Sequence, residues 1–236
     1  MSREFRAVFF DVDDTLFDRE RAQHLMAHRM MAERPELLGG FDAERVVQAF
    51  LESDRISEEE YTLDVSADQF RARRMQAFLA LLGLSDAHWN GLAEMYVTVY
   101  PTLDAPVTGA RAVIEYLADR CRLGVISNGL ADVQYTKLDA LGIRERFECV
   151  VLSGELGVGK PSPGIFTHAA SLLGAAPGDC IYIGDSYADD VLGAKGAGMA
   201  ACWFNPTGVA IDGGVRPDFE VRALSELPKL LAPALT

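Results

Sequence analysis

The sequence predicts an α/β protein with a doubly wound parallel sheet and an inserted all-helical domain. Five short apolar runs have the uninterrupted hydrophobic pattern of strands that are covered on both faces. Helical patterns separate the last four runs, and this alternation favours a parallel sheet with right-handed crossovers. Between the first and second runs, residues 18–104 show helical patterns only. That stretch far exceeds the dozen or so residues that a crossover needs, so it indicates an insertion.

Each predicted strand is short and rich in Val, Ile or aromatic residues. In chain order, the strands are expected at 7–10, 123–127, 149–153, 180–184 and 201–204. Helices between the last four strands are expected at 130–141, 162–174 and 187–197. After a loop rich in Gly and Pro, 219–221 should add an edge strand and 223–231 a last helix.

The insertion contains four amphipathic stretches, each preceded by an Asp or Ser that can cap a helix. The helices are expected at 19–33, 43–54, 67–82 and 86–100. We therefore predict an α/β core formed by residues 1–17 and 105–236, and a helical domain formed by residues 18–104.

The net charge of −13 over 236 residues argues against nucleic-acid polymers and anionic membranes as partners, because both attract basic surfaces. A small anionic ligand is compatible with this charge, since a pocket sets its own local field. The four cysteines lack metal-site spacing and lie in or beside apolar runs, which favours reduced thiols. Because we find neither a signal peptide nor a membrane-spanning run, we expect a cytoplasmic protein. The oligomeric state is left open.

Acidic residues lie where two predicted strands end. Asp11 and Asp13 follow the first strand, and Asp185 follows the fourth. In an open parallel sheet, ligands bind outside the carboxyl ends of the strands. Two carboxylates so close together are either turn and capping acids or ligands of a cation. An all-oxygen set without His or Cys suits Mg²⁺, which we predict as the cofactor.

The residues at these strand ends can also divide the work of phosphoryl transfer. Asp11 can attack phosphorus as a nucleophile, and Asp13 can protonate the leaving oxygen and then activate water. Ser127 and the backbone N–H of Asn128 can hold phosphoryl oxygens after the second strand. Lys160 can neutralise the charge that develops on the nucleophile and the phosphate.

The stretch GELGVGK at residues 154–160 offers a competing interpretation, because it fits the first seven positions of the loop G-x-x-x-x-G-K-[ST] of nucleoside triphosphatases. The eighth position is Pro161, which has neither the hydroxyl that would bind Mg²⁺ nor a backbone N–H. We therefore interpret the stretch as a loop that delivers Lys160 to a phosphoryl group.

Taken together, the four strand ends resemble those of the haloacid dehalogenase superfamily, and the resemblance covers the chain outside the helical insertion. The motifs, in the family's order, are Asp-x-Asp-x-Thr-Leu at 11–16, Ser127 after an apolar strand, Lys160 before Pro161, and Gly-Asp-Ser-x-x-x-Asp at 184–190. The resemblance implies a phosphoaspartate intermediate on Asp11. It also implies Mg²⁺ held by Asp11, Asp185 and the backbone carbonyl of Asp13, and a helical cap inserted after the first motif.

The same resemblance implies roles for two further residues and narrows the chemistry. It puts Thr15 among the phosphate-binding groups and Asp190 behind the metal, with Asp189 as the alternative for that second role. Asp13 favours phosphoryl chemistry over dehalogenation, because a halide needs no proton to leave. The insertion contains no lysine, which excludes the Schiff-base mechanism of the superfamily's phosphonate hydrolases.

We therefore predict a Mg²⁺-dependent phosphatase that acts on a small phosphomonoester, such as a nucleoside monophosphate or a sugar phosphate. Segments such as ISNG and GVGKPSPGIF look most like the branch of pyrimidine nucleotidases and acylneuraminate 9-phosphatases. Two alternatives stay open. One is a phosphosugar mutase with the same four motifs, and the other is a non-enzymatic protein-binding module.

Overall fold

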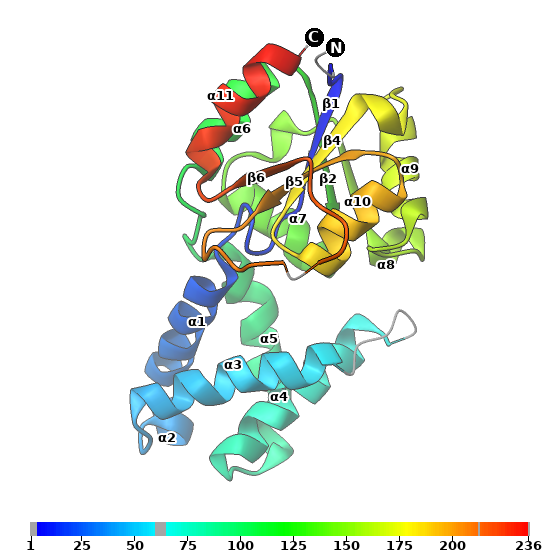
Figure 1. Ribbon diagram of the computed structural model, residues 1–236. Helices are drawn as coiled ribbons and strands as arrows, with labels where there is room; N and C mark the ends of the chain where they lie inside the picture. Colours follow the sequence, from blue (N-terminus) through cyan, green and yellow to red (C-terminus); the bar gives the residue numbers. More distant parts are fainter. Residues whose placement is uncertain (1–3, 60–64, 212, 236) are drawn as a thin grey trace. The chain divides into compact units, whose positions relative to one another are not determined.

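The computed structural model describes residues 4–59, 65–211 and 213–235 (Figure 1). The chain divides into two compact units, one formed by Met1–Asp18 with Pro106–Thr236 and the other by Arg19–Ala105. We call them the core unit and the helical unit. Each has its own set of buried apolar side chains.

The core unit is built on one sheet of six parallel strands. They are β1 (Ala7–Phe10), β2 (Arg122–Ser127), β3 (Cys149–Leu152), β4 (Cys180–Gly184), β5 (Ala200–Phe204) and β6 (Phe219–Val221). Their order in the sheet is β3-β2-β1-β4-β5-β6, and every pairing is parallel. The predicted fold class, a doubly wound parallel sheet, is confirmed.

The strand order reverses direction at β1. The chain runs outward from β1 through β2 to β3, and then returns to place β4 on the other side of β1. In open α/β sheets, this switch point leaves a crevice at the carboxyl ends of the central strands. Asp11 follows β1 directly, so the topology puts it at the centre of that edge.

Helices cover both faces of the sheet. In chain order they are α6 (Ala110–Ala118), α7 (Ala131–Ala140), α8 (Ser153–Leu156), α9 (Pro163–Leu172), α10 (Leu192–Gly196) and α11 (Leu227–Leu231). Helix α6 contacts α11 and β2, whereas α9 contacts α10, β2 and β3. Figure 1 shows α6 and α11 on one side of the sheet and α9 and α10 on the other. The sequence analysis did not predict α6 or α8.

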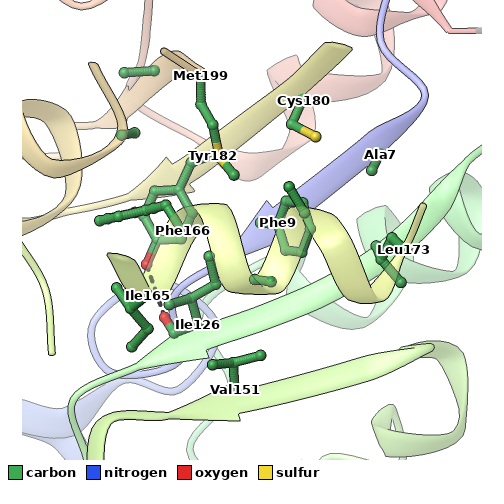
Figure 2. Packing of buried hydrophobic residues seen from close by; sticks show 14 of the residues in the cluster. Ala7, Phe9, Ile126, Val151, Ile165, Phe166, Leu173, Cys180, Tyr182 and Met199 are labelled. Atoms are coloured by element: carbon green, nitrogen blue, oxygen red, sulfur yellow. Dashed lines mark hydrogen bonds between the residues drawn. The ribbon is translucent and has the colours of Figure 1, made fainter. Parts of the chain in front are cut away.

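One apolar layer lies between the sheet and helices α9 and α10 (Figure 2). Alternate strand residues point into it, among them Phe9 from β1 and Tyr182 from β4. The Tyr182 ring meets Phe166 of α9 edge-on, with centroids 5.1 Å apart. Gly124 of β2 lies against the Phe9 ring, where an added Cβ would come within 2.5 Å of a ring carbon. This tight layer fixes the strand ends that carry the polar residues.

The helical unit contains α1 (Arg19–Glu33), α2 (Pro35–Leu38), α3 (Ala43–Glu59), α4 (Ala67–Leu82) and α5 (Trp89–Val99). In its described residues, 19–59 and 65–105, it has no strand. Helix α4 begins with a capping box between Ser66 and Gln69, as the sequence led us to expect of Ser66. Phe50 of α3 and Phe78 of α4 meet edge-on in its core, with centroids 5.6 Å apart. That this unit acts as a cap stays a prediction.

Candidate active site

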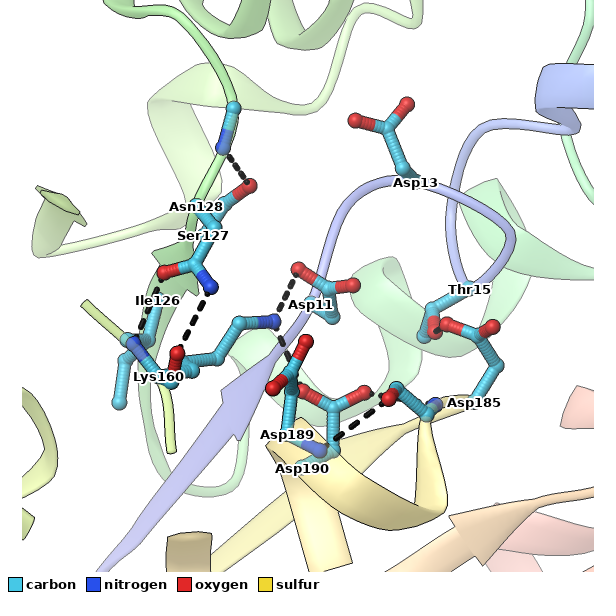
Figure 3. Close-up of polar contacts among 12 residues, drawn as sticks. Asp11, Asp13, Thr15, Ile126, Ser127, Asn128, Lys160, Asp185, Asp189 and Asp190 are labelled. Atoms are coloured by element: carbon cyan, nitrogen blue, oxygen red, sulfur yellow. Dashed lines mark hydrogen bonds and ion pairs between the residues drawn. The ribbon is translucent and has the colours of Figure 1, made fainter. Parts of the chain in front are cut away.

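Polar side chains from four loops of the core unit meet at the carboxyl edge of the sheet (Figure 3). Asp11 follows β1, Ser127 ends β2, Lys160 follows β3 and α8, and Asp185 follows β4. Parallel strands end at the same edge of a sheet, which is why residues far apart in the sequence come together here.

A tight turn after β1 sets the geometry of the first motif. The Val12 carbonyl accepts hydrogen bonds from the N–H groups of Leu16 and Phe17, both at 2.8 Å. Asp14 has a φ of 54°, a left-handed conformation that Asp tolerates better than most residues. Within this turn, the Thr15 hydroxyl donates a hydrogen bond of 3.2 Å to the Asp185 carboxylate. The turn therefore connects the ends of β1 and β4.

Lys160 is a buried cation of the site. Its Nζ lies 2.8 Å from Oδ1 of Asp11 and 2.7 Å from Oδ1 of Asp190, and it donates to the Tyr182 hydroxyl at 3.0 Å. Burial alone would lower the pKa of Lys160, but the charges of Asp11 and Asp190 outweigh burial and raise it. The lysine therefore stays charged.

Asp190 holds Lys160 from behind. A π-helical turn, Tyr187–Val191, follows Ser186 and turns Asp190 back toward β4. Its Oδ2 accepts a hydrogen bond from the Ser186 N–H at 2.9 Å, and an added Cβ on Gly184 would lie 2.2 Å from that oxygen. The glycine of the fourth motif is therefore a steric requirement of the buried aspartate. Asp189, the alternative considered from the sequence, is only half-buried.

Asn128 organises the loop that carries Lys160. Its side-chain amide donates to the Lys160 carbonyl at 3.0 Å and accepts from the Lys160 N–H at 2.8 Å. The Ser127 hydroxyl accepts a hydrogen bond from the Gly129 N–H at 3.1 Å. The role expected of Asn128 from the sequence was that of its backbone N–H, whereas its side chain also links two loops.

Three carboxylates of the site are close enough to share a cation. Ligand atoms of Asp11, Asp185 and Asp190 all lie within 4.8 Å of one another. Burial, together with the charge of Asp190, raises the pKa of Asp185 to about 7, and burial also raises that of Asp11. A bound divalent cation would relieve both the desolvation and the repulsion. An all-oxygen donor set of this kind fits Mg²⁺.

Asp13 stands apart from this group (Figure 3). Its carboxylate contacts Gln134 and Lys137 of α7, two residues that the sequence analysis did not select. The Tyr182 hydroxyl, which donates to the Ile126 carbonyl at 2.9 Å, is a third buried group of the site that it missed. Their only signal in the sequence is a polar group inside or beside an apolar pattern, which by itself indicates no function.

The family model of haloacid dehalogenase-like hydrolases matches residues 5–198. The chain belongs to this family. The resemblance inferred from the four motifs is thereby confirmed, and the protein is a hydrolase.

Among curated relatives of this hydrolase, pyrimidine 5'-nucleotidase YjjG of Escherichia coli (strain K12) is 27% identical over 225 residues, which cover 95% of this chain and 96% of the relative. The N-acylneuraminate-9-phosphatase of Rattus norvegicus is 30% identical over 243 residues, covering 96% of this chain and 93% of the relative. Both belong to the branch that the sequence segments resemble.

Among solved structures, the magnesium-bound HAD-hydrolase YfnB from Bacillus subtilis superposes on this hydrolase with a TM-score of 0.80. It is 26% identical and covers 98% of this chain and 100% of its own. No helix in the described part of our chain is long and apolar enough to cross a membrane.

Proposed function

We propose that this hydrolase is a Mg²⁺-dependent phosphatase that cleaves a small phosphomonoester through a phosphoaspartate on Asp11. The observation that carries the proposal is the buried cluster at the carboxyl edge of the sheet. One lysine there contacts two aspartates, and a third aspartate lies within ligand distance of both. Such a cluster suits the joint binding of a negatively charged phosphoryl group and a divalent cation.

In the first half-reaction, an oxygen of Asp11 attacks phosphorus, and the bond from phosphorus to the leaving oxygen breaks. Asp13 donates a proton to that oxygen, so that an alcohol leaves. Lys160 is within 2.8 Å of Asp11 and stabilises the charge that passes from the carboxylate to the phosphoryl oxygens.

In the second half-reaction, water attacks the phosphorus of the aspartyl phosphate. Asp13, now deprotonated, takes a proton from this water, and the bond between phosphorus and the Asp11 oxygen breaks to release phosphate. The Ser127 hydroxyl, the Asn128 N–H and the Thr15 hydroxyl are the proposed donors that hold phosphoryl oxygens through both steps, together with Lys160.

The proposed ligands of Mg²⁺ are Asp11, Asp185 and the backbone carbonyl of Asp13. Asp190, which is 1% exposed and contacts Lys160, supports this set from behind. When bound, the cation would neutralise charge on the phosphoryl group and on the carboxylates. The helical unit is proposed to act as a cap.

The relatives support a small phosphate ester as substrate, because one is a pyrimidine 5'-nucleotidase and another an N-acylneuraminate-9-phosphatase. Both are phosphatases, which favours hydrolysis over the phosphosugar mutase alternative. Membership of a hydrolase family likewise favours an enzyme over a protein-binding module. A nucleoside monophosphate and a sugar phosphate are the two substrate types to test first.

The direct test is Asp11→Asn, assayed for phosphate release from p-nitrophenyl phosphate and from nucleotides and sugar phosphates with Mg²⁺. We expect kcat to fall on the order of 10³-fold or more, because the nucleophile is lost. Asp139→Asn is the matched control, since Asp139 is exposed and pairs with Arg144 away from the site. Undiminished turnover by a folded Asp11→Asn protein would refute the mechanism.

A further inference from the structure

Helix α7 presents two polar side chains to the carboxylate of Asp13. Nε2 of Gln134 donates a hydrogen bond of 2.6 Å to Oδ2, and Nζ of Lys137 forms an ion pair with Oδ1. Gln134 and Lys137 are three residues apart, so they share one face of the helix. Each oxygen of the carboxylate therefore has its own donor on α7.

Both donors are buried, which is unusual for their residue types. Gln134 is 1% exposed and Lys137 is 2% exposed. A buried ammonium group is costly unless it is paired, and the ion pair of Lys137 with Asp13 offsets this cost. The Lys137 Nζ also lies 4.7 Å from the centre of the Phe17 ring, which belongs to the same turn as Asp13.

The backbone after β2 is shaped around Gln134. A Cβ added to Gly129 would lie 1.8 Å from Nε2 of Gln134, so a side chain at this position would displace the amide. The helix itself is anchored by Val133 and Leu138, which are buried. The two donors are thus held by the core unit, while the Asp13 side chain that they contact is 22% exposed.

We propose that Gln134 and Lys137 are positioning residues that hold both oxygens of Asp13 in the orientation needed for proton transfer to the leaving group. This inference rests on the proposed function, in which Asp13 is the acid and base. General acid catalysis contributes about 10²- to 10⁴-fold and depends on the geometry of the donor.

The test uses two substrates that differ in their need for a proton. The leaving group of p-nitrophenyl phosphate departs readily without one, whereas the alkoxide of uridine 5'-monophosphate requires one. We compare kcat/KM, which reports the steps up to aspartyl-phosphate formation and excludes its later hydrolysis. For Lys137→Met and Gln134→Leu, kcat/KM should fall about 10²-fold for the nucleotide and less than about 5-fold for the aryl ester.

Two controls make the result specific. Lys195→Met, which removes a partly exposed lysine paired with Asp218, should leave both substrates unchanged. In an Asp13→Asn background, Lys137→Met should cause no further loss with the nucleotide, because the residue acts through Asp13. Circular dichroism shows whether each variant folds. If Lys137→Met does not fold, Gln134→Leu, which leaves no unpaired charge, tests the inference in its place.

An equal loss with both substrates, or a full additional loss in the Asp13→Asn background, would overturn the inference and leave only a structural role. If the wild-type protein is inactive on both substrates, or Asp11→Asn retains activity, the proposed function fails instead. The two failures are therefore distinguishable.

Discussion

At the scale of single residues, Lys160 combines burial with two ion pairs in the core unit. It is 8% exposed and stands between two aspartates, Asp11 and Asp190, which are themselves buried. Removing one partner of a buried ion pair leaves uncompensated charge, which is much more harmful than never having buried the pair. The lysine is thus expected to support both the chemistry and the stability of the strand ends.

We predict that Lys160→Met lowers the free energy of unfolding by about 3 kcal/mol at neutral pH without Mg²⁺, because Asp11 and Asp190 lose their shared counter-charge. Urea denaturation followed by circular dichroism measures the change. The partly exposed pair of Lys195 with Asp218 provides the comparison, and Lys195→Met should change stability by less than about 1 kcal/mol. If both substitutions lowered stability equally, Lys160 would not be the shared counter-charge of Asp11 and Asp190.

At the scale of elements, α3 and α4 of the helical unit are joined by a buried ion pair. Nη1 of Arg74 lies 2.6 Å from Oδ1 of Asp54. The guanidinium carbon is 4.6 Å from the centre of the Phe50 ring and 4.5 Å from that of Tyr96. Arg74 is 1% exposed, so its charge relies on Asp54 and on the two rings.

Asp54→Asn is therefore predicted to weaken the packing of α3 against α4. The expected loss is about 3 kcal/mol in the free energy of opening, read as faster hydrogen exchange of amides in both helices. Glu52→Gln removes an exposed carboxylate on α3 that pairs with Arg55, and exchange should stay unchanged there. Slower or unaltered exchange in Asp54→Asn would show that Arg74 does not need the aspartate.

The elements also show what the sequence alone could predict. Strands such as β1 and β4 were located because a strand buried on both faces has an uninterrupted apolar run. Helix α6 was missed even though Val113, Ile114 and Leu117 follow a helical spacing, because no element was assigned between the predicted insertion and the second strand. The stretch 154–160 was interpreted as a loop, but Ser153–Leu156 form one helical turn, α8.

The residues of the candidate site likewise fall into those that the sequence could predict and those that it could not. Asp11, Lys160 and Asp185 could be selected because the carboxyl ends of parallel strands must converge. Gln134 and Lys137 could not be selected, because the face of α7 that meets Asp13 is decided by tertiary packing. Spacing along a helix says which residues share a face, but not what that face contacts.

At the scale of the whole molecule, the proposed metal ligands all belong to the core unit. A ligand stabilises the structure that binds it, by about 2.7 kcal/mol at a concentration of 100 times Kd. Because the two units have separate cores, they need not unfold in a single two-state transition. The stabilisation by a bound ligand is then expected in the core unit alone.

We predict that Mg²⁺ slows hydrogen exchange in β1 and β4 by the factor that corresponds to about 2.7 kcal/mol at 100 times Kd, while α3 and α4 exchange as before. Asp185→Asn should abolish this protection. It should also stabilise the metal-free core unit, because burial and Asp190 raise the pKa of Asp185 to about 7 and its ionised form is costly. Protection by Mg²⁺ that persists in Asp185→Asn would place the metal elsewhere.

The points where the chain leaves and re-enters the core unit have a consequence for how such proteins can diversify. Phe17 and Pro106 form an antiparallel bridge, and the Val107 N–H donates to the Leu16 carbonyl at 3.0 Å. The two ends of the intervening segment are thus already held together by backbone contacts within the core unit. Because each doubling of loop length adds only about 0.6 kcal/mol of closure entropy, segments of very different size can be inserted between these two chain ends. The candidate active site at the carboxyl edge of the sheet can then stay constant while the enclosed segment is replaced.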